Sequence, residues 1–458
     1  MDALQTWLAQ APTADGVRPL DRLPPPTGNR PRASYRRQAA PGSATSELAA
    51  QDIVALVREN GVLRWRAGAA PLPRFGPRAG GPRAAQGARA ALPMAEVLQQ
   101  FAFERLPGSQ VYTALGALDT KLTPQAAWPG QGHGLRRWRN GALEPFIDPA
   151  AVKGKALLIF IHGTFSNSES LLDQGLMKKK PGQDFLADAQ RKYDLLLAYD
   201  HPTLSVSPML NAFDLAALLR AGPKSVDIVC HSRGGLVARW YCEAFADPAL
   251  RRRVVFVASP LGGTSLAAAP SLKNALDLLT NVADALRIGG DSFMANALFT
   301  AVSGLLRVLS SVTGAVLSGP LLDAAIALVP GLDAMSRVGN NPELLRLQAK
   351  AQGQDFRQGL LRYAAIRSNF EPQAIGWNFL RLFSQPMLRA GDWAADLVFD
   401  GPNDLVVNTD AMALTADRQP IELAHDFGRS RTVHHCNYFE QPQTVEALRS
   451  VFEVGSRV

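Results

Sequence analysis

The sequence is poor in cysteine and has none of the residue spacings that bind a metal ion or a nucleotide. Its three cysteines, Cys230, Cys242 and Cys436, are odd in number and show no CxxC spacing, which argues against a disulfide framework and against a zinc site. A Walker-type phosphate loop and a dinucleotide fingerprint are also missing. We therefore expect no bound cofactor and no metal.

Long apolar runs are also missing. The first residues lack the basic segment and apolar run of a signal peptide, and within residues 266–360 no charge-free stretch reaches the roughly 18 residues of a bilayer-spanning helix. We therefore expect a cytoplasmic protein, with leaderless export as the alternative. The net charge of +8 comes largely from arginines in the N-terminal third rather than from one patch on the core, so no nucleic-acid partner is expected.

The N-terminal part, residues 1–150, has the pattern of an accessory region. Residues 11–50 and 67–92 are rich in Pro, Arg, Ala and Gly, and they cannot bury enough apolar surface to fold alone. Between them, residues 53–66 predict a β-hairpin with a tight turn at Asn60-Gly61. A helix near residues 94–103 and a strand near residues 110–118 are expected to follow.

An α/β core begins at residue 151. Short apolar runs typical of buried parallel strands alternate with helical patterns, which predicts a mostly parallel sheet flanked by helices. The expected core comprises residues 151–265 and 361–458. The expected strands are 156–161, 193–200, 225–230, 253–259 and 363–368, and the expected helices are 182–189, 211–219 and 443–453.

Residues 266–360 interrupt this alternation with several apolar helical stretches. We predict a helical lid or cap inserted into the core, and we name residues 290–330 as a candidate for transient contact with a membrane or lipid interface. A membrane-embedded hairpin is the less favoured interpretation.

The motif that organises the chain is the segment Ser225–Gly235. An apolar run ends at Cys230-His-Ser232-Arg-Gly234, and a helical pattern starts at once, which predicts a strand–turn–helix with Ser232 at its tip. Small residues two positions either side of the serine allow the sharp turn. Such a turn presents the serine hydroxyl to a base and to free backbone N–H groups at the start of the helix.

A serine hydroxyl needs a base, and an acid that orients that base, before it can act as a nucleophile. Ser232, Asp404 and His435 follow one another in the chain order Ser…Asp…His, which is the order of one particular scaffold. Asp396, Asp400 and Asp404 share a segment, and His434 and His435 are adjacent, so spacing alone leaves alternatives open for both partners.

Five segments give the chain a resemblance to the α/β-hydrolase superfamily, specifically its lipase-like branch of triacylglycerol lipases and esterases. They are Phe160–Thr164, Val229–Ala238, Ser259–Ser265, Asn403–Val407 and His435–Phe439.

The resemblance implies an α/β-hydrolase fold with Ser232 as nucleophile. It also implies an oxyanion hole formed by the backbone N–H groups of Thr164 and Arg233. In this family the acid precedes a short apolar run, which favours Asp404 over Asp400. The base precedes a few apolar residues and the last helix, which favours His435 over His434.

The remaining histidines and the elbow cysteine have simpler interpretations. His162 and His231 are expected to brace neighbouring turns by hydrogen bonding, and His201 to be a loop residue. Cys230 should face the sheet interior as a small buried hydrophobic residue rather than act as a nucleophile.

The function predicted from these features is hydrolysis of carboxylic esters, most naturally lipid or other acyl esters, through an acyl-enzyme on Ser232. The same triad would also serve a thioesterase, an amidase or an acyltransferase. An alternative from another class is a non-catalytic binding or scaffold protein that keeps the fold. The oligomeric state is not predicted.

Overall fold

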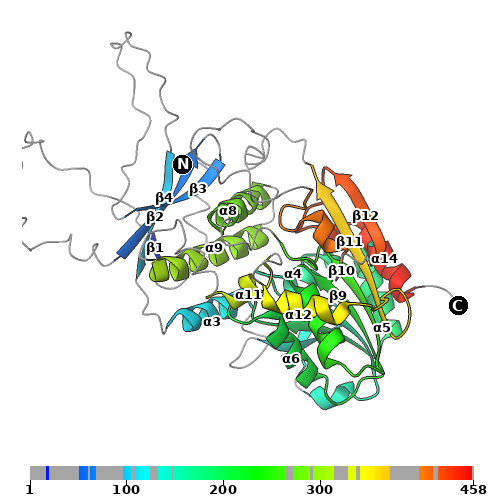
Figure 1. Ribbon diagram of the computed structural model, residues 1–458. Coiled ribbons are helices and arrows are strands. Elements are labelled where there is room, and N and C mark those ends of the chain that lie inside the picture. Colours follow the sequence, from blue (N-terminus) through cyan, green and yellow to red (C-terminus); the bar gives the residue numbers. More distant parts are fainter. Residues whose placement is uncertain are drawn as a thin grey trace, which may run out of the picture. The chain divides into compact units, whose positions relative to one another are not determined.

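The computed structural model describes most of the predicted core and several segments of the N-terminal part (Figure 1). The described residues are 17–19, 51–59, 62–68, 96–104, 110–123, 133–146, 148–264, 272–288, 292–313, 328–336, 341–371, 402–415 and 421–455. The chain divides into two compact units. The first comprises Met1–Ala114, Leu276–Ala325 and Trp377–Gln385, and the second Leu115–Ala275, Ile326–Gly376 and Pro386–Val458.

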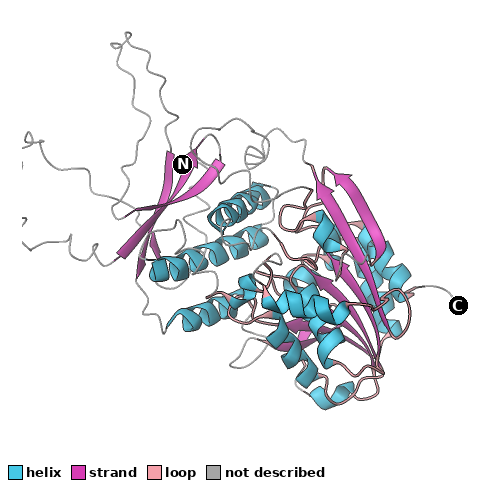
Figure 2. Cartoon of the chain, in the orientation of Figure 1, coloured by secondary structure: helices cyan, strands magenta, loops and turns pink. Residues whose placement is uncertain are grey.

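The second unit is built on an eight-stranded sheet with the order β12-β11-β10-β9-β7-β8-β5-β6. Figure 2 draws the strands of the chain in magenta and its helices in cyan. From β12 to β8 all neighbours are parallel, whereas β5 is antiparallel to both β8 and β6. The strands are β5 (Gly134–Arg139), β6 (Ala142–Pro145), β7 (Ala156–Ile161), β8 (Leu195–Asp200), β9 (Ser225–His231), β10 (Arg251–Val257), β11 (Leu361–Phe370) and β12 (Glu422–Ser430).

Helices cover both faces of this sheet, as each apolar strand requires (Figure 1). Strands β7, β8, β9 and β10 are buried along nearly their whole length, which explains their continuous runs of Leu, Ile and Val. The described helices and helical turns that lie wholly or mostly in this unit are α3 (Val111–Leu122), η3 (Pro149–Val152), α4 (Ser168–Leu172), η4 (Leu176–Lys178), α5 (Lys180–Lys192), α6 (Pro208–Leu218), α7 (Gly234–Trp240), η5 (Tyr241–Phe245), α11 (Pro330–Asp333), α12 (Pro342–Ala351), η10 (Thr409–Met412), η12 (Tyr438–Glu440) and α14 (Pro442–Phe452).

This sheet confirms the predicted fold class. The five predicted core strands are present as β7 to β11, and the three predicted core helices as α5, α6 and α14. A mostly parallel sheet in this order, with a serine turn directly after β9, is the α/β-hydrolase fold. The active sites of open parallel sheets lie beyond the carboxyl ends of the strands. The turns that follow β7, β9 and β10 are therefore the place to look for the site.

The sheet also contains strands that the sequence analysis did not predict. β5 and β6 lie in the range 1–150, which was expected to be accessory, and they form the antiparallel edge of the core sheet. β12 is an edge strand whose side chains are mostly exposed or half-buried. Its polar sequence therefore lacks the apolar pattern from which a strand could be predicted.

The described residues of the first unit include a four-stranded antiparallel sheet, helix α9 and most of helix α8. The strands β1 (Val17–Pro19), β4 (Glu96–Glu104), β2 (Gln51–Glu59) and β3 (Val62–Gly68) lie in that order. β2 and β3 pair as the predicted hairpin, with Glu59 opposite Val62. The predicted turn residues, Asn60 and Gly61, lie outside the described residues.

Helices α8 (Leu272–Ile288) and α9 (Ser292–Thr313) pack with this sheet. Asp277 and Asn281 of α8 accept hydrogen bonds from the backbone N–H groups of Trp65 and Leu63, at 2.7 and 2.9 Å. Helix α8 thus lies along the edge strand β3 and accepts hydrogen bonds from two backbone N–H groups of that strand. Phe299 of α9 lies 6.4 Å from the Trp65 ring, so the apolar insertion supplies part of the core of this unit.

Two predictions near the N-terminus are wrong. Residues 96–104 form strand β4 rather than a helix, because this segment is hydrogen-bonded on both sides, to β1 and to β2. Residues 111–122 form helix α3 rather than a strand. Its buried residues Val111, Leu115, Leu118 and Leu122 recur with helical spacing, although β-branched and aromatic residues at its start favour a strand.

The predicted domain boundaries and the lid role of residues 266–360 stay predictions. Parts of that insertion, residues 265–271, 289–291, 314–327 and 337–340, lie outside the described residues, as do Asp396 and Asp400. No helix in the described segments has both the length and the apolarity to cross a membrane.

Candidate active site

Ser232 occupies the sharp turn between β9 and α7 that its sequence motif predicts. Its φ angle is +52°, a left-handed conformation that is uncommon for a residue with a side chain. Its N–H donates to the Val257 carbonyl at 3.0 Å, and its own carbonyl accepts from Gly235 N–H at 2.9 Å. The strained residue is therefore held from both sides, by β10 and by the first turn of α7.

Neighbouring backbone approaches this turn so closely that side chains are excluded. A Cβ on Gly234 would lie 2.5 Å from the Ile161 carbonyl oxygen and 2.6 Å from that of His162, at the end of β7. A Cβ on Gly163 would lie 2.7 Å from the Cβ of Ser232. The backbone that follows β7 therefore lies directly against the serine side chain, and glycine is required at both positions.

Asp404 is a fully buried carboxylate with four hydrogen-bond donors around it. Its Oδ1 accepts from the N–H groups of Val406 (3.2 Å) and Val407 (2.9 Å). Its Oδ2 accepts from the Tyr438 hydroxyl at 3.2 Å and from Nδ1 of His435 at 2.9 Å. Buried carboxylates are stable as anions only when they are bonded in this way.

His435 is oriented by this carboxylate. A carboxylate can only accept, so Nδ1 carries the proton and Nε2 is left with its lone pair. The backbone N–H of His435 also donates to the Asp404 carbonyl, at 3.0 Å. Asp404 therefore fixes both the main chain and the ring of His435.

His231, which directly precedes Ser232, connects the serine turn to the histidine. Its Nε2 donates to the His435 carbonyl at 2.9 Å, and the two rings lie 4.7 Å apart. Burial lowers the pKa of His231 to about 3, so its ring is neutral. The predicted bracing role of His231 is confirmed, and it brings the loop of His435 beside the serine turn.

The adjacent histidine has a different environment. Nδ1 of His434 accepts from the N–H of Cys436 at 3.3 Å, and its ring packs edge-on against Phe370 at 5.7 Å. Burial lowers its pKa to about 4. Of the two histidines, His435 is the one whose ring is hydrogen-bonded to Asp404.

The two expected oxyanion donors belong to the turns that follow β7 and β9. Thr164 follows Gly163, and Arg233 follows Ser232. Neither of their backbone N–H groups has an acceptor within the described part of the chain. Free N–H groups beside a serine hydroxyl are what an oxyanion requires.

The Arg233 side chain has a structural role. It is fully buried and donates to the carbonyls of Val206 (2.5 Å) and Gly331 (3.4 Å). Burial lowers its pKa to about 10, and the nearby Asp119 acts in the opposite direction. Asp119 itself accepts from the backbone of Thr203, Leu204 and Ser205. The guanidinium therefore holds loops around the turn instead of reaching outward toward an anionic group.

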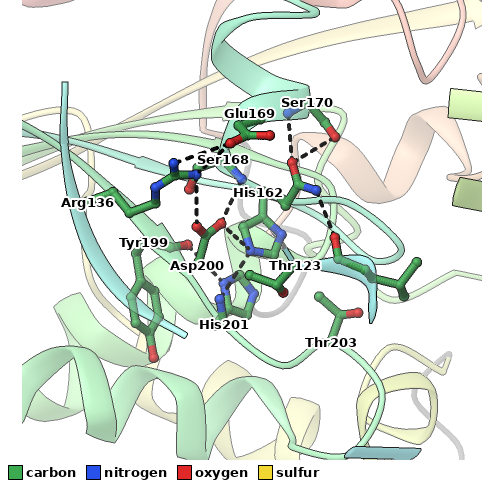
Figure 3. Close-up of polar contacts among 12 residues, drawn as sticks. Thr123, Arg136, His162, Ser168, Glu169, Ser170, Tyr199, Asp200, His201 and Thr203 are labelled. Carbon is green, nitrogen blue, oxygen red and sulfur yellow. Dashed lines mark hydrogen bonds and ion pairs between the residues drawn. The ribbon is translucent and has the colours of Figure 1, made fainter. Parts of the chain in front are cut away.

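Beneath the turn after β7 lies a buried polar network (Figure 3). His162 and His201 stack with their ring centroids 4.1 Å apart, and Asp200 lies 3.7 Å from Nε2 of His162. Arg136 lies 3.6 Å from the other oxygen of Asp200 and also pairs with Glu169 at 3.2 Å. His162 thus braces its turn as predicted, whereas His201 proves to be a fully buried member of the same network.

Cys230, the cysteine beside the serine turn, does not have the features of a nucleophile. Cys230 is fully buried, with its Sγ 3.4 Å from the Val255 carbonyl, and burial raises its pKa well above the usual value. It is the inert interior residue that the sequence predicted. The described residues contain no cluster of His, Cys, Asp and Glu that could hold a metal ion.

Two residues near the site were not singled out from sequence. Tyr438 donates to Asp404, and burial together with that carboxylate raises its pKa well above the usual value, so its hydroxyl stays protonated. Its place beside Phe439, in the segment that follows His435, was the only signal for it in the sequence. Met335 accepts from the Thr164 hydroxyl at 3.4 Å and pairs with Thr264 through its carbonyl, and no local pattern marks it.

A family model described as "Domain of unknown function (DUF7379)" matches residues 131–453 of the chain. The chain belongs to this family. The match begins just before β5, which agrees with the place of β5 and β6 in the core sheet. No curated protein matches the sequence.

Several solved structures resemble this one at low sequence identity. A mature lipase from Bacillus licheniformis is 15% identical, with a TM-score of 0.35 over 67% of this chain and 93% of that one. Lipase 1 from Pelosinus fermentans is 11% identical, with a TM-score of 0.38 over 67% and 100%. Phospholipase PlaB from Legionella pneumophila is 14% identical, with a TM-score of 0.36 over 65% and 59%. At such values the activity of those proteins does not transfer to this chain.

Proposed function

We propose that this protein is a serine hydrolase that cleaves carboxylic esters, with Ser232, His435 and Asp404 as its catalytic triad. The observation that carries the proposal is the combination of a left-handed serine at the β9–α7 turn with a histidine whose Nδ1 is bonded to a buried carboxylate. The His231–His435 contact joins the two halves of this arrangement.

The proposed reaction gives each of these residues a role. Ser232 Oγ attacks the ester carbonyl carbon while Nε2 of His435 takes the hydroxyl proton, and the Asp404 carboxylate stabilises the resulting imidazolium. The carbonyl oxygen becomes an oxyanion that the N–H groups of Thr164 and Arg233 bind. Collapse breaks the bond to the alcohol, which leaves with the proton from His435. Water then attacks the acyl-enzyme with His435 again as base.

We further propose that the acyl group of the substrate is apolar, as in a lipid or other acyl ester. The support is the apolar Met335, which touches Thr164 beside the expected oxyanion position. An apolar chain placed there would contact a polarizable thioether instead of a charged group.

The test is hydrolysis of p-nitrophenyl esters of increasing acyl length by the parent protein and by Ser232→Ala. We expect turnover in the parent that rises with acyl length, and a loss of about 10⁵-fold or more in kcat for the variant. Ser170→Ala is a matched control, because it removes a half-buried hydroxyl of the same unit that only supports the start of α4. A folded parent without turnover on any ester, or an active Ser232→Ala variant, would contradict the proposal.

A further inference from the structure

Both ring nitrogens of the buried His162 are bonded to backbone. Nδ1 lies 2.9 Å from the carbonyl oxygen of Gly163, and Nε2 lies 3.2 Å from the backbone nitrogen of His201. The carbonyl can only accept and the N–H can only donate. The ring is therefore neutral, with its proton on Nδ1 and a lone pair on Nε2.

The surroundings of His162 hold its ring in one orientation. The side chain is fully buried, and the His201 ring stacks on it at 4.1 Å with an interplanar angle of 22°. Asp200, the residue before His201, is fixed by the backbone N–H of Ser168, which donates to its Oδ1 at 2.7 Å (Figure 3). The donor on Nδ1 therefore points at Gly163 from a rigid position.

The peptide unit that His162 holds is the one that carries the expected oxyanion donor. In a trans peptide the C=O and N–H groups point in opposite directions. The Gly163 carbonyl is turned toward the buried His162 ring, so the N–H of Thr164 in the same peptide unit is turned away from that ring. The α-carbon of Gly163 lies against Ser232, since a Cβ added there would be 2.7 Å from the serine Cβ.

Glycine makes such a restraint necessary. Gly163 cannot carry a side chain at this close approach, and a glycine backbone rotates more freely than any other. Without an external partner for its carbonyl, the Gly163–Thr164 peptide could adopt orientations that turn the N–H away from the serine. A preorganised donor is worth more than one that must reorient during the reaction.

We propose that His162 is a positioning residue for the oxyanion hole: its Nδ1–H holds the Gly163 carbonyl and thereby aims the Thr164 N–H at the developing oxyanion. This inference rests on the proposed function. His162 does not touch the substrate, and it acts through one peptide unit.

Two substitutions separate this role from ordinary packing. In His162→Asn the amide nitrogen can take the place of Nδ1 and still donate to Gly163, while the acceptor for His201 is lost. In His162→Gln the side-chain oxygen can reach the place of Nε2 and still accept from His201, while the donor to Gly163 is lost. A purely structural role would make the two variants similar, or would favour the one that keeps the His201 bond.

The kinetic test compares both variants with the parent on one p-nitrophenyl ester. Loss of an oxyanion donor lowers kcat by about 10²–10³-fold. We expect His162→Gln to fall by about a hundredfold in kcat with KM changed less than about threefold, and His162→Asn to stay within about tenfold of the parent. The inhibition constant of an alkyl trifluoromethyl ketone, which forms a tetrahedral oxyanion on the serine, should rise in His162→Gln by the factor that kcat/KM falls. Equal losses in both variants, or an unchanged inhibition constant, would overturn the positioning role.

A second measurement does not depend on activity. Long-range ¹⁵N–¹H spectra of the histidine rings, with the His162 signal assigned by its loss in His162→Asn, should show a neutral ring protonated at Nδ1. A proton at Nε2, or an imidazolium at pH 7, would contradict the geometry itself. If the parent hydrolyses no ester although the ring is protonated at Nδ1, the proposed function is wrong and the oxyanion role falls with it. If the parent is active and the two variants behave alike, only the positioning role is wrong.

Discussion

The core contains two carboxylate–histidine pairs that use the same residue types for opposite purposes. In Asp404–His435 the carboxylate lies 2.9 Å from Nδ1, and no hydrogen bond within the described residues engages Nε2, which can take a proton. In Asp200–His162 the separation is 3.7 Å, and backbone groups engage both ring nitrogens. The comparison teaches that the partners of each nitrogen, rather than the presence of a nearby acid, decide whether a buried histidine can act as a base.

The two carboxylates also differ in the charge of the groups around them. Asp404 is surrounded by neutral donors and one imidazole, so its charge is available to stabilise an imidazolium. Asp200 faces the buried guanidinium of Arg136 at 3.6 Å and a backbone N–H, so its charge is already compensated. Under the proposed function, the first pair serves proton transfer and the second holds its turns in place.

The largest effect is expected when His435 of the first pair is compared with its sequence neighbour His434. His435→Asn removes the base, and we expect kcat on a p-nitrophenyl ester to fall by about 10⁴-fold or more. His434→Asn should keep kcat within about threefold, because Asn can still accept from the Cys436 N–H. A larger loss in His434→Asn than in His435→Asn would reassign the base.

A second test exchanges the carboxylates. Asp404→Asn should lower kcat by about 10⁴-fold, since the amide favours the wrong imidazole tautomer. Asp200→Asn should keep activity within about tenfold and instead lower the free energy of unfolding by about 1–3 kcal/mol, because Arg136 loses one buried counter-charge and keeps the other, Glu169. Urea titrations and ester kinetics on both variants measure the two effects. Similar activity losses in both would remove the distinction between the pairs.

Gly163, which lies against Ser232 and whose carbonyl is bonded to His162, offers a third test. In Gly163→Ala the added Cβ would meet the Ser232 Cβ at 2.7 Å, so the backbone must shift, and we expect kcat to fall by about 10²-fold. Gly116→Ala on α3 is the matched control, because nothing lies within 4 Å of its Cβ and a helix interior favours Ala by about 0.5–1 kcal/mol. Full activity in Gly163→Ala would show that the turn after β7 is not part of the site.

The smallest predicted effect is a loss of folding stability at low pH. Burial lowers the pKa values of His162, His201, His231 and His434 from 6.5, to about 4 for His434. The unfolded chain therefore binds these protons first, and stability that is present above about pH 6.5 declines as the pH falls toward 4. His434→Asn should reduce this decline by about 1.4 kcal/mol per pH unit within that window. Urea midpoints of the core at pH 7 and pH 5 measure it, and an unchanged difference would contradict the buried neutral state.

Much of the core could be predicted because its signals are local. The apolar runs of β7 to β10 and the small residues around Ser232 follow from burial on both faces and from the sharp turn. Asp404 was favoured by its position before a short apolar run, and the structure shows those residues donating to its Oδ1. In these cases the residues that determine the local structure lie within the same short stretch of sequence.

The parts that sequence did not reveal depend on distant partners. β4 is a strand because β1 and β2 pair with it from both sides, and nothing in its own residues excludes a helix. The pairing of α8 with β3 joins residues more than 200 positions apart. The role inferred for His162 likewise depends on His201, which sequence placed only as a loop residue.

The measurement that tests the central claim most directly is labelling by a fluorophosphonate, read by intact mass at pH 7. A fluorophosphonate forms a bond from an activated serine Oγ to phosphorus as fluoride leaves. The account predicts that the parent gains one phosphonyl group, that Ser232→Ala gains none, and that Asp404→Asn reacts far more slowly. An unlabelled but folded parent, or equal labelling of Ser232→Ala, would contradict it.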